Sequence, residues 1–202
     1  MARKYVQRAR AEGAAETRRR IVESARSVLL ASPVPTLEIA DVAEIARVAR
    51  STIYTAFGSR PGLIEAVMED SLTRAGFGRL VELFGLEDAV EALDRGLDQG
   101  CQMYAEEHQV LRRLLLLAEL DPDGAAPYAR QQRGRSAGMR ALARRLHEQG
   151  RLRAGTSVEE AAAVLWVMTG FDTFDQLYSG WGLDASSCSS RIVAMARAVL
   201  LK

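Results

Sequence analysis

The stretch from Asp41 to Arg60, DVAEIARVARSTIYTAFGSR, constrains the fold of this chain more than any other. It begins with apolar residues spaced along one helical face, namely Val42, Ala43 and Ala46. The pattern breaks at residues 47–49, and a second short helix is predicted from Arg50. On this second helix Ile53 and Phe57 share one face, whereas another face carries polar groups: Arg50, Ser51, Tyr54 and Thr55. Two short helices joined by a tight turn, the second with outward hydrogen-bonding groups, are typical of a helix that enters the DNA major groove.

The same stretch resembles the helix-turn-helix of the TetR family of bacterial repressors. The resemblance rests on Val42-Ala43, Ala46-Arg47-Val48, Thr52-Ile53-Tyr54, Phe57 and Ser59-Arg60. It implies an N-terminal three-helix DNA-binding domain followed by a helical domain that binds a small ligand and forms a dimer. We expect DNA contacts from seven residues: Thr36, Arg50, Ser51, Thr52, Tyr54, Thr55 and Arg60. Among them, Tyr54 resembles the family tyrosine whose hydroxyl binds a backbone phosphate.

Two residues depart from the family pattern at the turn. Arg47 stands where the family has glycine, which costs about 1 kcal/mol if this position must be left-handed. Ala49 stands where the family has serine, so a side-chain N-cap that contributes about 1 kcal/mol is missing. Both departures are expected to affect the stability of the turn more than its identity.

Charge is distributed unevenly along the chain. Residues 1–60 hold eleven Lys and Arg against six Asp and Glu, a balance of +5, and the remainder carries −4, although the whole chain carries only +1. Such an asymmetry suggests that only the first third approaches a polyanion. Residues 1–16 carry four basic side chains, those of Arg3, Lys4, Arg8 and Arg10. This segment is either a solvated terminus or an arm that binds DNA. Arg18, Arg19 and Arg20 oppose a helix dipole and either contact DNA or are solvated.

Composition excludes several other classes of protein. The two cysteines, Cys101 and Cys188, do not suggest a disulfide framework, and no Cys or His cluster has zinc spacing. The N-terminus lacks the apolar region of a secretory signal, and no apolar run is long enough to span a membrane. We therefore expect a cytoplasmic protein without a metal or another cofactor.

Helical periodicity continues through the rest of the chain, and no strand-like alternation appears. About nine helices are predicted, with Thr36 capping the second, Ser59 capping the fourth, and a Ser157–Glu160 capping box. One helical face is expected over 86–108, and long helices over 127–149, 157–178 and 185–201. The predicted fold is all-α, with a DNA-binding domain over residues 1–60 and a ligand-binding and dimerisation domain over 61–202.

The predicted second domain carries a candidate effector site. Aromatic and polarizable residues are expected on its inner helical faces: Cys101, Tyr104, Tyr128, Met139, Trp166, Phe171 and Phe174. Asp172 and Asp175 add polar groups within an apolar helix, as ligand pockets require, but they lack a third ligand for a metal ion. His108 is the last residue of the helical face over 86–108. Its ring is expected either to be hydrogen-bonded within the protein or to be half-exposed.

Dimerisation is expected because the helices over 157–178 and 185–201 hold more apolar surface than a monomer readily buries. Pairing about a two-fold axis would bury it in a four-helix bundle, and the resemblance implies the same arrangement. The last helix contributes Ile192, Met195, Ala196 and Val199 to one face.

The favoured function is a repressor that binds a palindromic operator as a homodimer and is released by a small apolar or amphipathic effector. An all-helical enzyme acting in the same cavity is the alternative, although the sequence offers no activated nucleophile, metal cluster or phosphate loop. A DNA-coating protein without a preferred operator is the third possibility. Turnover of a bound molecule and the presence of a preferred operator distinguish the three.

Overall fold

The computed structural model describes residues 2–31 and 33–202, with side chains described from residue 11 onward. The described residues form eleven α-helices and one π-helix, and their only β-type pairing is an isolated bridge between Leu152 and Leu201. The all-α prediction is confirmed. The chain divides into two compact units, Met1–Ser71 with Gln109–Ala129 and Leu72–His108 with Arg130–Lys202.

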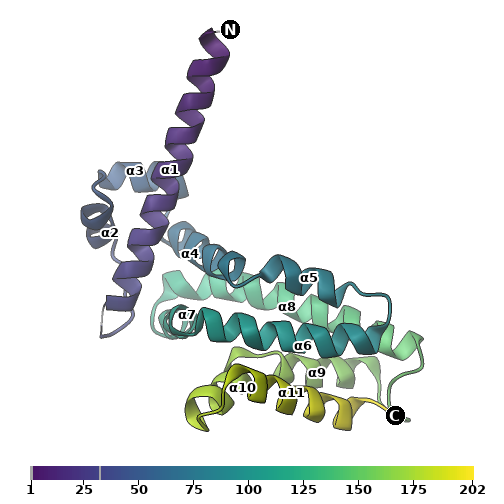
Figure 1. Ribbon diagram of the computed structural model, residues 1–202. Coiled ribbons are helices and arrows are strands. Elements are labelled where there is room, and N and C mark those ends of the chain that lie inside the picture. The colour runs from purple at the N-terminus through teal and green to yellow at the C-terminus, as the bar shows by residue number, and fades with distance from the viewer. Residues whose placement is uncertain (1, 32) are drawn as a thin grey trace. The chain divides into compact units, whose positions relative to one another are not determined.

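The first unit is built on a long first helix. It contains α1 (Ala2–Ala31), α2 (Ile39–Ala46), α3 (Arg50–Phe57), most of α4 (Arg60–Arg74), most of α7 (His108–Leu120) and the start of α8 (Pro122–Glu148). In Figure 1, α2 and α3 lie beside α1, and the contacts between these helices agree. Fully buried side chains come from α1, α2, α3, α4 and α7 and from the loop before α2: Ile21, Leu29, Leu37, Val42, Ile53, Leu63, Val67 and Leu117.

Two local predictions for this unit are wrong. Helix α1 begins at Ala2, not near Thr17, because residues 2–16 are rich in Ala, Arg and Glu, which favour helix. The side chains of Arg3, Lys4, Arg8 and Arg10, and with them the proposed basic arm, lie outside the described residues. Thr36 does not cap α2, since the helix starts at Ile39 and its N-cap is Glu38, without a side-chain bond. The predicted cap of α4 is confirmed, because Ser59 Oγ accepts a hydrogen bond from the Gly62 amide.

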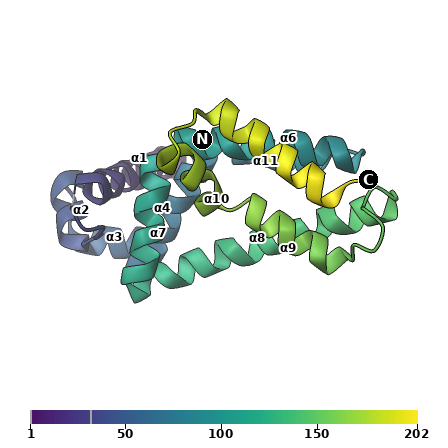
Figure 2. The same ribbon diagram turned by 90° about the horizontal axis from the view of Figure 1, so that it is seen from below.

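The second unit packs its helices around one apolar core. It contains α5 (Phe77–Phe84), α6 (Ala89–Glu106), α9 (Val158–Met168), α10 (Phe171–Asp175), the π-helix η1 (Gln176–Gly180) and α11 (Ala185–Leu200), together with most of α8. Figures 1 and 2 both show α6 and α11 side by side. The core between the helices is formed mainly by aliphatic residues and one phenylalanine: Leu93, Leu97, Leu142, Leu146, Leu165, Phe174, Ile192 and Ala196.

Breaks in the second unit raise the number of helices above the nine expected. An additional helix, α5, begins after Gly76, whose φ of 84° is left-handed, and α6 ends before His108. The helix expected over 157–178 is interrupted at Thr169 and Gly170 and continues as α10 and η1. There the Thr169 hydroxyl donates to the Leu165 carbonyl, a local bond that competes with helix continuation. The predicted capping box of Ser157 and Glu160 is confirmed.

Candidate functional site

The turn between α2 and α3 depends on one left-handed residue. Arg47 has φ 53° and ψ 49°, so the position requires the conformation that glycine adopts most readily. The Val48 amide donates to the Ala43 carbonyl at 3.0 Å, and the Arg47 amide donates to the Glu44 carbonyl at 3.1 Å. These two bonds form a Schellman motif, which satisfies carbonyls at the end of α2. The turn is therefore closed by backbone bonds although it lacks the usual glycine.

The outer face of α3 carries the polar side chains that the spacing predicted. Arg50, Ser51 and Thr55 are exposed, Tyr54 is 49% exposed and Thr52 is half-buried, whereas Ile53 is fully buried. Ala49 provides no side-chain cap, as expected from the sequence. The Thr55 hydroxyl donates to the Ser51 carbonyl at 2.8 Å, so its oxygen is left to accept. The face thus offers a cation, a phenol and hydroxyl groups to a partner.

The other two predicted DNA contacts lie elsewhere in the same unit. Thr36 is half-buried in the loop before α2. Arg60 is turned into an ion-pair network, with Nη2 at 2.6 Å from Asp121 and Nη1 at 3.0 Å from Asp123. Its Nε donates to the Leu37 carbonyl at 2.8 Å. The hydrogen bond to Asp121 raises the pKa of Arg60 and lowers that of Asp121, although burial opposes both shifts.

Two arginines of α1 bind carbonyls at the ends of α2 and α3. Arg20 Nε donates to the carbonyl of Ala46, the last residue of α2, at 3.0 Å. Arg18 Nη1 donates to the Ala56 carbonyl near the end of α3 at 2.8 Å, and its guanidinium lies 4.3 Å from the centre of the Phe57 ring. Cations at helix C-termini are favoured by the helix dipole. Of the three consecutive arginines in α1, these two reach α2 and α3, whereas Arg19 pairs with Glu16 on α1 itself.

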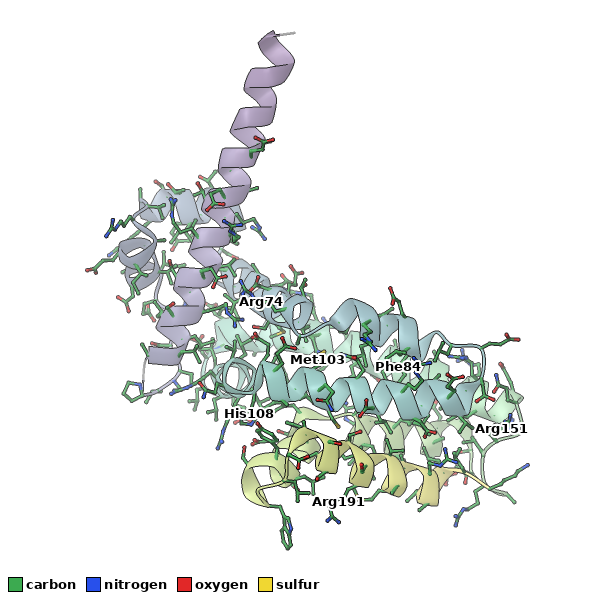
Figure 3. All side chains as sticks on the ribbon, viewed as in Figure 1. Arg74, Phe84, Met103, His108, Arg151 and Arg191 are labelled. Carbon is green, nitrogen blue, oxygen red and sulfur yellow. The ribbon has the colours of Figure 1, made fainter. Side chains whose placement is uncertain are left out.

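Three of the predicted effector residues meet in the second unit. The ring of Tyr104 lies 5.4 Å from that of Phe171, edge to face, and 5.7 Å from that of Phe174. Tyr178 stacks on Phe174 at 5.0 Å, and the His108 ring lies 5.0 Å from Tyr178. Figure 3 labels His108 beside α10. These five rings form an aromatic cluster that joins α6, α10 and η1 to the first residue of α7.

A polar group of three side chains adjoins the aromatic cluster. His108 Nε2 lies 2.6 Å from Asp175 Oδ1 and 3.1 Å from Ser179 Oγ, which itself donates to the same carboxylate oxygen at 2.7 Å. A Ser-His-Asp catalytic triad instead uses the two ring nitrogens for the two partners. Because both partners here meet Nε2, this arrangement does not have the geometry of an activated serine. No local spacing pairs His108 with Asp175, which lies 67 residues away.

Trp166 is linked to the aromatic cluster through Arg135 and Thr169. The Arg135 guanidinium lies 3.5 Å from the centre of the Trp166 ring, a cation–π contact. Arg135 Nη1 also donates to the Trp166 carbonyl at 2.6 Å and to Thr169 Oγ1 at 2.9 Å. The Tyr104 hydroxyl donates to the Thr169 carbonyl at 2.8 Å. Arg135 was not among the residues predicted from the sequence.

The remaining predicted effector residues are part of the core. Cys101 and Met139 are buried in the apolar cluster of the second unit, and burial raises the pKa of the Cys101 thiol to about 12. Such a thiol stays protonated and unreactive near neutral pH. Asp172 is exposed. Among the residues that the structure describes, no group of three metal-ligating side chains occurs, and no helix is long and apolar enough to cross a bilayer.

Apolar side chains are exposed on α9 and α11. Met195 and Val199 are exposed on α11, whereas Ile192 and Ala196, predicted on the same face, are buried within the protomer. Val167 is exposed at the end of α9. Trp181, between η1 and α11, is 78% exposed. We define these exposed residues as the α9–α11 apolar patch: Val167, Trp181, Met195 and Val199.

Comparison with solved structures shows bacterial regulators with the same fold. NalD, the secondary repressor of the MexAB-OprM multidrug efflux pump in Pseudomonas aeruginosa, is 18% identical, with a TM-score of 0.74 over 95% of this chain and 98% of that chain. SmeT, the repressor of the Stenotrophomonas maltophilia multidrug efflux pump SmeDEF, is 14% identical, with a TM-score of 0.68 over 92% and 90%. FadR from Bacillus subtilis, solved in complex with stearoyl-CoA, is 16% identical, with a TM-score of 0.70 over 88% and 96%.

At these identities the matches establish the fold, which is that of TetR-type transcriptional regulators. No family model matches the chain, and no curated protein sequence matches it.

Proposed function

We propose that the chain is a ligand-responsive transcriptional repressor of the TetR family. The observation that carries this proposal is the outer face of α3, where Arg50, Ser51, Tyr54 and Thr55 are exposed. They stand on a short helix that follows a tight Schellman turn. A helix of this kind places its N-terminal side chains against base edges in the major groove. The fold shared with NalD and SmeT, both repressors, supports the same function.

Within this function we assign separate roles on DNA to Arg50 and Tyr54. Arg50 begins α3, and its guanidinium can make a bidentate pair with guanine O6 and N7. Tyr54 lies one turn later, where its hydroxyl would bind a backbone phosphate and so position the helix without reading sequence. Ser51, Thr52 and Thr55 supply further hydroxyl contacts. We leave Arg60 out of the contact set, because its guanidinium is bound by Asp121 and Asp123.

We infer that the effector is a small apolar or amphipathic molecule bound at the aromatic cluster. Tyr104, Phe171 and Phe174 supply apolar area, and the neighbouring Trp166 would report binding through its fluorescence. Binding there must favour the conformation that is unable to bind the operator, since an effector shifts an equilibrium only by its difference in affinity. FadR of Bacillus subtilis, whose fold is similar, is solved with the amphipathic ligand stearoyl-CoA.

A homodimer follows from the same proposal, because a palindromic operator requires two reading helices related by a two-fold axis. The α9–α11 apolar patch is the surface that we assign to the partner copy. Met195→Asp should separate the copies, and Ser190→Asp, at an exposed polar position on another face of the same helix, is the control for charge alone. Sedimentation at micromolar concentration measures the outcome, and a monomeric wild type is incompatible with the proposal. A DNA-binding role implies a cytoplasmic location.

Selection of genomic DNA fragments by the purified chain tests the function. The expected result is a short palindromic motif whose binding is lost in Arg50→Ala. Enrichment of fragments without a common motif indicates a DNA-coating protein, and the absence of DNA binding removes the proposal. Genes beside the selected motif would suggest the effector.

A further inference from the structure

Arg47 is the only residue other than glycine that has a positive φ in the part of the chain that the structure describes. Its φ of 53° and ψ of 49° are left-handed, and a residue with a Cβ atom adopts this conformation at a cost in stability. Strained backbone positions of this kind are concentrated at functional sites. Glycine would relieve the strain, so any benefit of arginine at this position must come from its side chain.

The Arg47 side chain lies on the solvent side of the turn. Ala46, which precedes it, is fully buried, and the Ala46 carbonyl accepts a hydrogen bond from Arg20 of α1. Arg47 is exposed, and no hydrogen bond or ion pair joins its side chain to another residue that the structure describes. The bonds that close the turn come from backbone groups. The guanidinium is therefore available to a partner outside the protein.

Arg47 lies close to the end of α3 that we assign to the major groove. It precedes Arg50, the first residue of α3, by three positions, so their Cα atoms are at most about 11 Å apart. The major groove is about 12 Å wide and is bordered by the phosphates of the two strands. While Arg50 contacts a base edge, the long side chain of Arg47 can therefore reach a phosphate at the border of the groove.

Cations are scarce in the helix-turn-helix itself. Residues 38–57 hold three acidic residues against two cations, Arg47 and Arg50. The arginines of α1 and α4 that reach this segment are bound to carbonyl or carboxylate oxygens within the protein. Because the three acidic residues repel a polyanion, a second exposed cation beside Arg50 favours the approach of DNA to this segment.

We infer that Arg47 binds a DNA phosphate, a contact that glycine at the same position could not make. The inference rests on the proposed function and adds a residue to the DNA contacts assigned there. A phosphate contact positions α3 without reading sequence. The left-handed arginine would thus lower the stability of the turn and raise its affinity for DNA.

The dependence of DNA affinity on salt tests this inference, since each phosphate contact contributes about 0.9 to the slope of log affinity against log salt concentration. The affinities of the full chain for a selected operator and for a duplex of random sequence are measured at roughly 50 and 200 mM salt. For Arg47→Ala, the ratio of the affinities at the two salt concentrations should fall about 3.5-fold for each bound copy.

Three further substitutions at Arg47 separate its charge from its backbone strain. Arg47→Gln should reduce this salt ratio as alanine does, whereas Arg47→Lys keeps the charge and should preserve it. Arg47→Gly should also reduce the salt ratio and weaken binding, although it relieves the strain and raises the unfolding temperature. If the more stable Arg47→Gly variant binds DNA as tightly as the wild type, the role of Arg47 is structural and the inference is overturned.

Arg144→Ala is the matched control for the loss of one positive charge. Arg144 is an exposed arginine of α8 in the second unit, which we do not assign to DNA. The salt ratio should be the same for this variant and for the wild type. An equal reduction in Arg144→Ala and Arg47→Ala would show that only net charge matters, and it would contradict the phosphate contact.

The two duplexes separate this inference from the proposed function. A reduced salt ratio for Arg47→Ala on the random duplex, without any preferred operator, supports the phosphate contact while the repressor proposal fails. An unchanged salt ratio on a bound operator contradicts the phosphate contact and leaves the repressor proposal intact. Failure of the wild type to bind either duplex removes both.

Discussion

In the first unit arginine side chains bind carbonyl groups at the ends of α2 and α3. In the second unit arginines also bind carbonyls, Arg145 that of Phe84 and Arg153 that of Ala198, but its main feature is an aliphatic core that adjoins the aromatic cluster. Arg18, Arg20 and Arg60 each reach backbone oxygen from another segment. In the second unit, Phe174 is buried among rings and aliphatic groups. Directional bonds fix the orientation of α2 and α3, while an apolar cluster can repack around a ligand. Under the proposed function, the first unit would read DNA and the second would sense a small molecule.

Among the substitutions that test this comparison, Phe174→Ala should cause the largest loss of unfolding free energy. The side chain is 1% exposed, and truncating a buried phenylalanine costs about 3–5 kcal/mol of unfolding free energy. Chemical denaturation measures the loss, and hydrogen exchange should locate it in the second unit. Phe77→Ala, at an exposed position of the same unit, is the control and should cost far less. If the two variants lose the same unfolding free energy, the aromatic cluster does not have a central role in the core.

Arg18→Ala should weaken the first unit by a smaller amount. It removes the hydrogen bond to Ala56 and the contact with Phe57, together about 1–2 kcal/mol. Exchange should rise in α3 and remain unchanged in α11. Arg19→Ala is the matched control, because Arg19 pairs with Glu16 on the exposed side of α1. If both changes act alike, Arg18 contributes only charge.

Arg47→Gly should stabilise the turn of the first unit. Glycine removes the left-handed strain at φ 53°, and the greater freedom of the unfolded chain offsets part of the gain, leaving about 0.5–1 kcal/mol. Arg47→Ala removes the same charge but keeps the Cβ atom, so it should give no such gain. Thermal unfolding of the two variants compares them directly.

The smallest expected effect is a response of the first unit to acid. The bond from Arg60 lowers the pKa of Asp121 below its unfolded value of about 3.9. The resulting stabilisation is complete above that value and is lost as the pH falls through the lower folded pKa. Asp121→Asn should remove this part of the acid dependence. Thermal unfolding from pH 6 to pH 3 tests it, and an unchanged profile would assign the acid response to other groups.

Local patterns in the sequence were enough to predict the turn and both faces of α3. Spacing over a few residues fixes which side of a short helix is buried, and Ile53 and Tyr54 lie as that spacing requires. A left-handed conformation at Arg47 was considered only because the resembling family has glycine there, and the structure has this conformation. The grouping of Tyr104, Phe171 and Phe174 was likewise expected from their inner faces.

Long-range polar contacts could not be predicted from the same patterns. Arg60 meets Asp121 across 61 positions, and Arg18 meets Ala56 across 38, so no local spacing distinguishes them from solvated arginines. The break at Thr169 was hidden by the surrounding apolar run, although the Thr-Gly pair is a recognisable helix end. Arg135 was missed because its partner Trp166 lies 31 positions away in the sequence, so no local spacing pairs the two residues.

The central claim is that the outer face of α3 reads DNA sequence through Arg50. The base preference of the Arg50→Ala variant tests it most directly. Wild type and variant are measured against every single-base change of the selected operator half-site, with Tyr54→Phe as the comparison. The account predicts that Arg50→Ala loses about 1–3 kcal/mol of discrimination at one base pair per half-site. Tyr54→Phe should instead weaken all sites alike and leave the base preference intact. If Arg50→Ala weakens every sequence equally and flattens the salt dependence, Arg50 binds phosphate and the outer face of α3 does not read sequence through it.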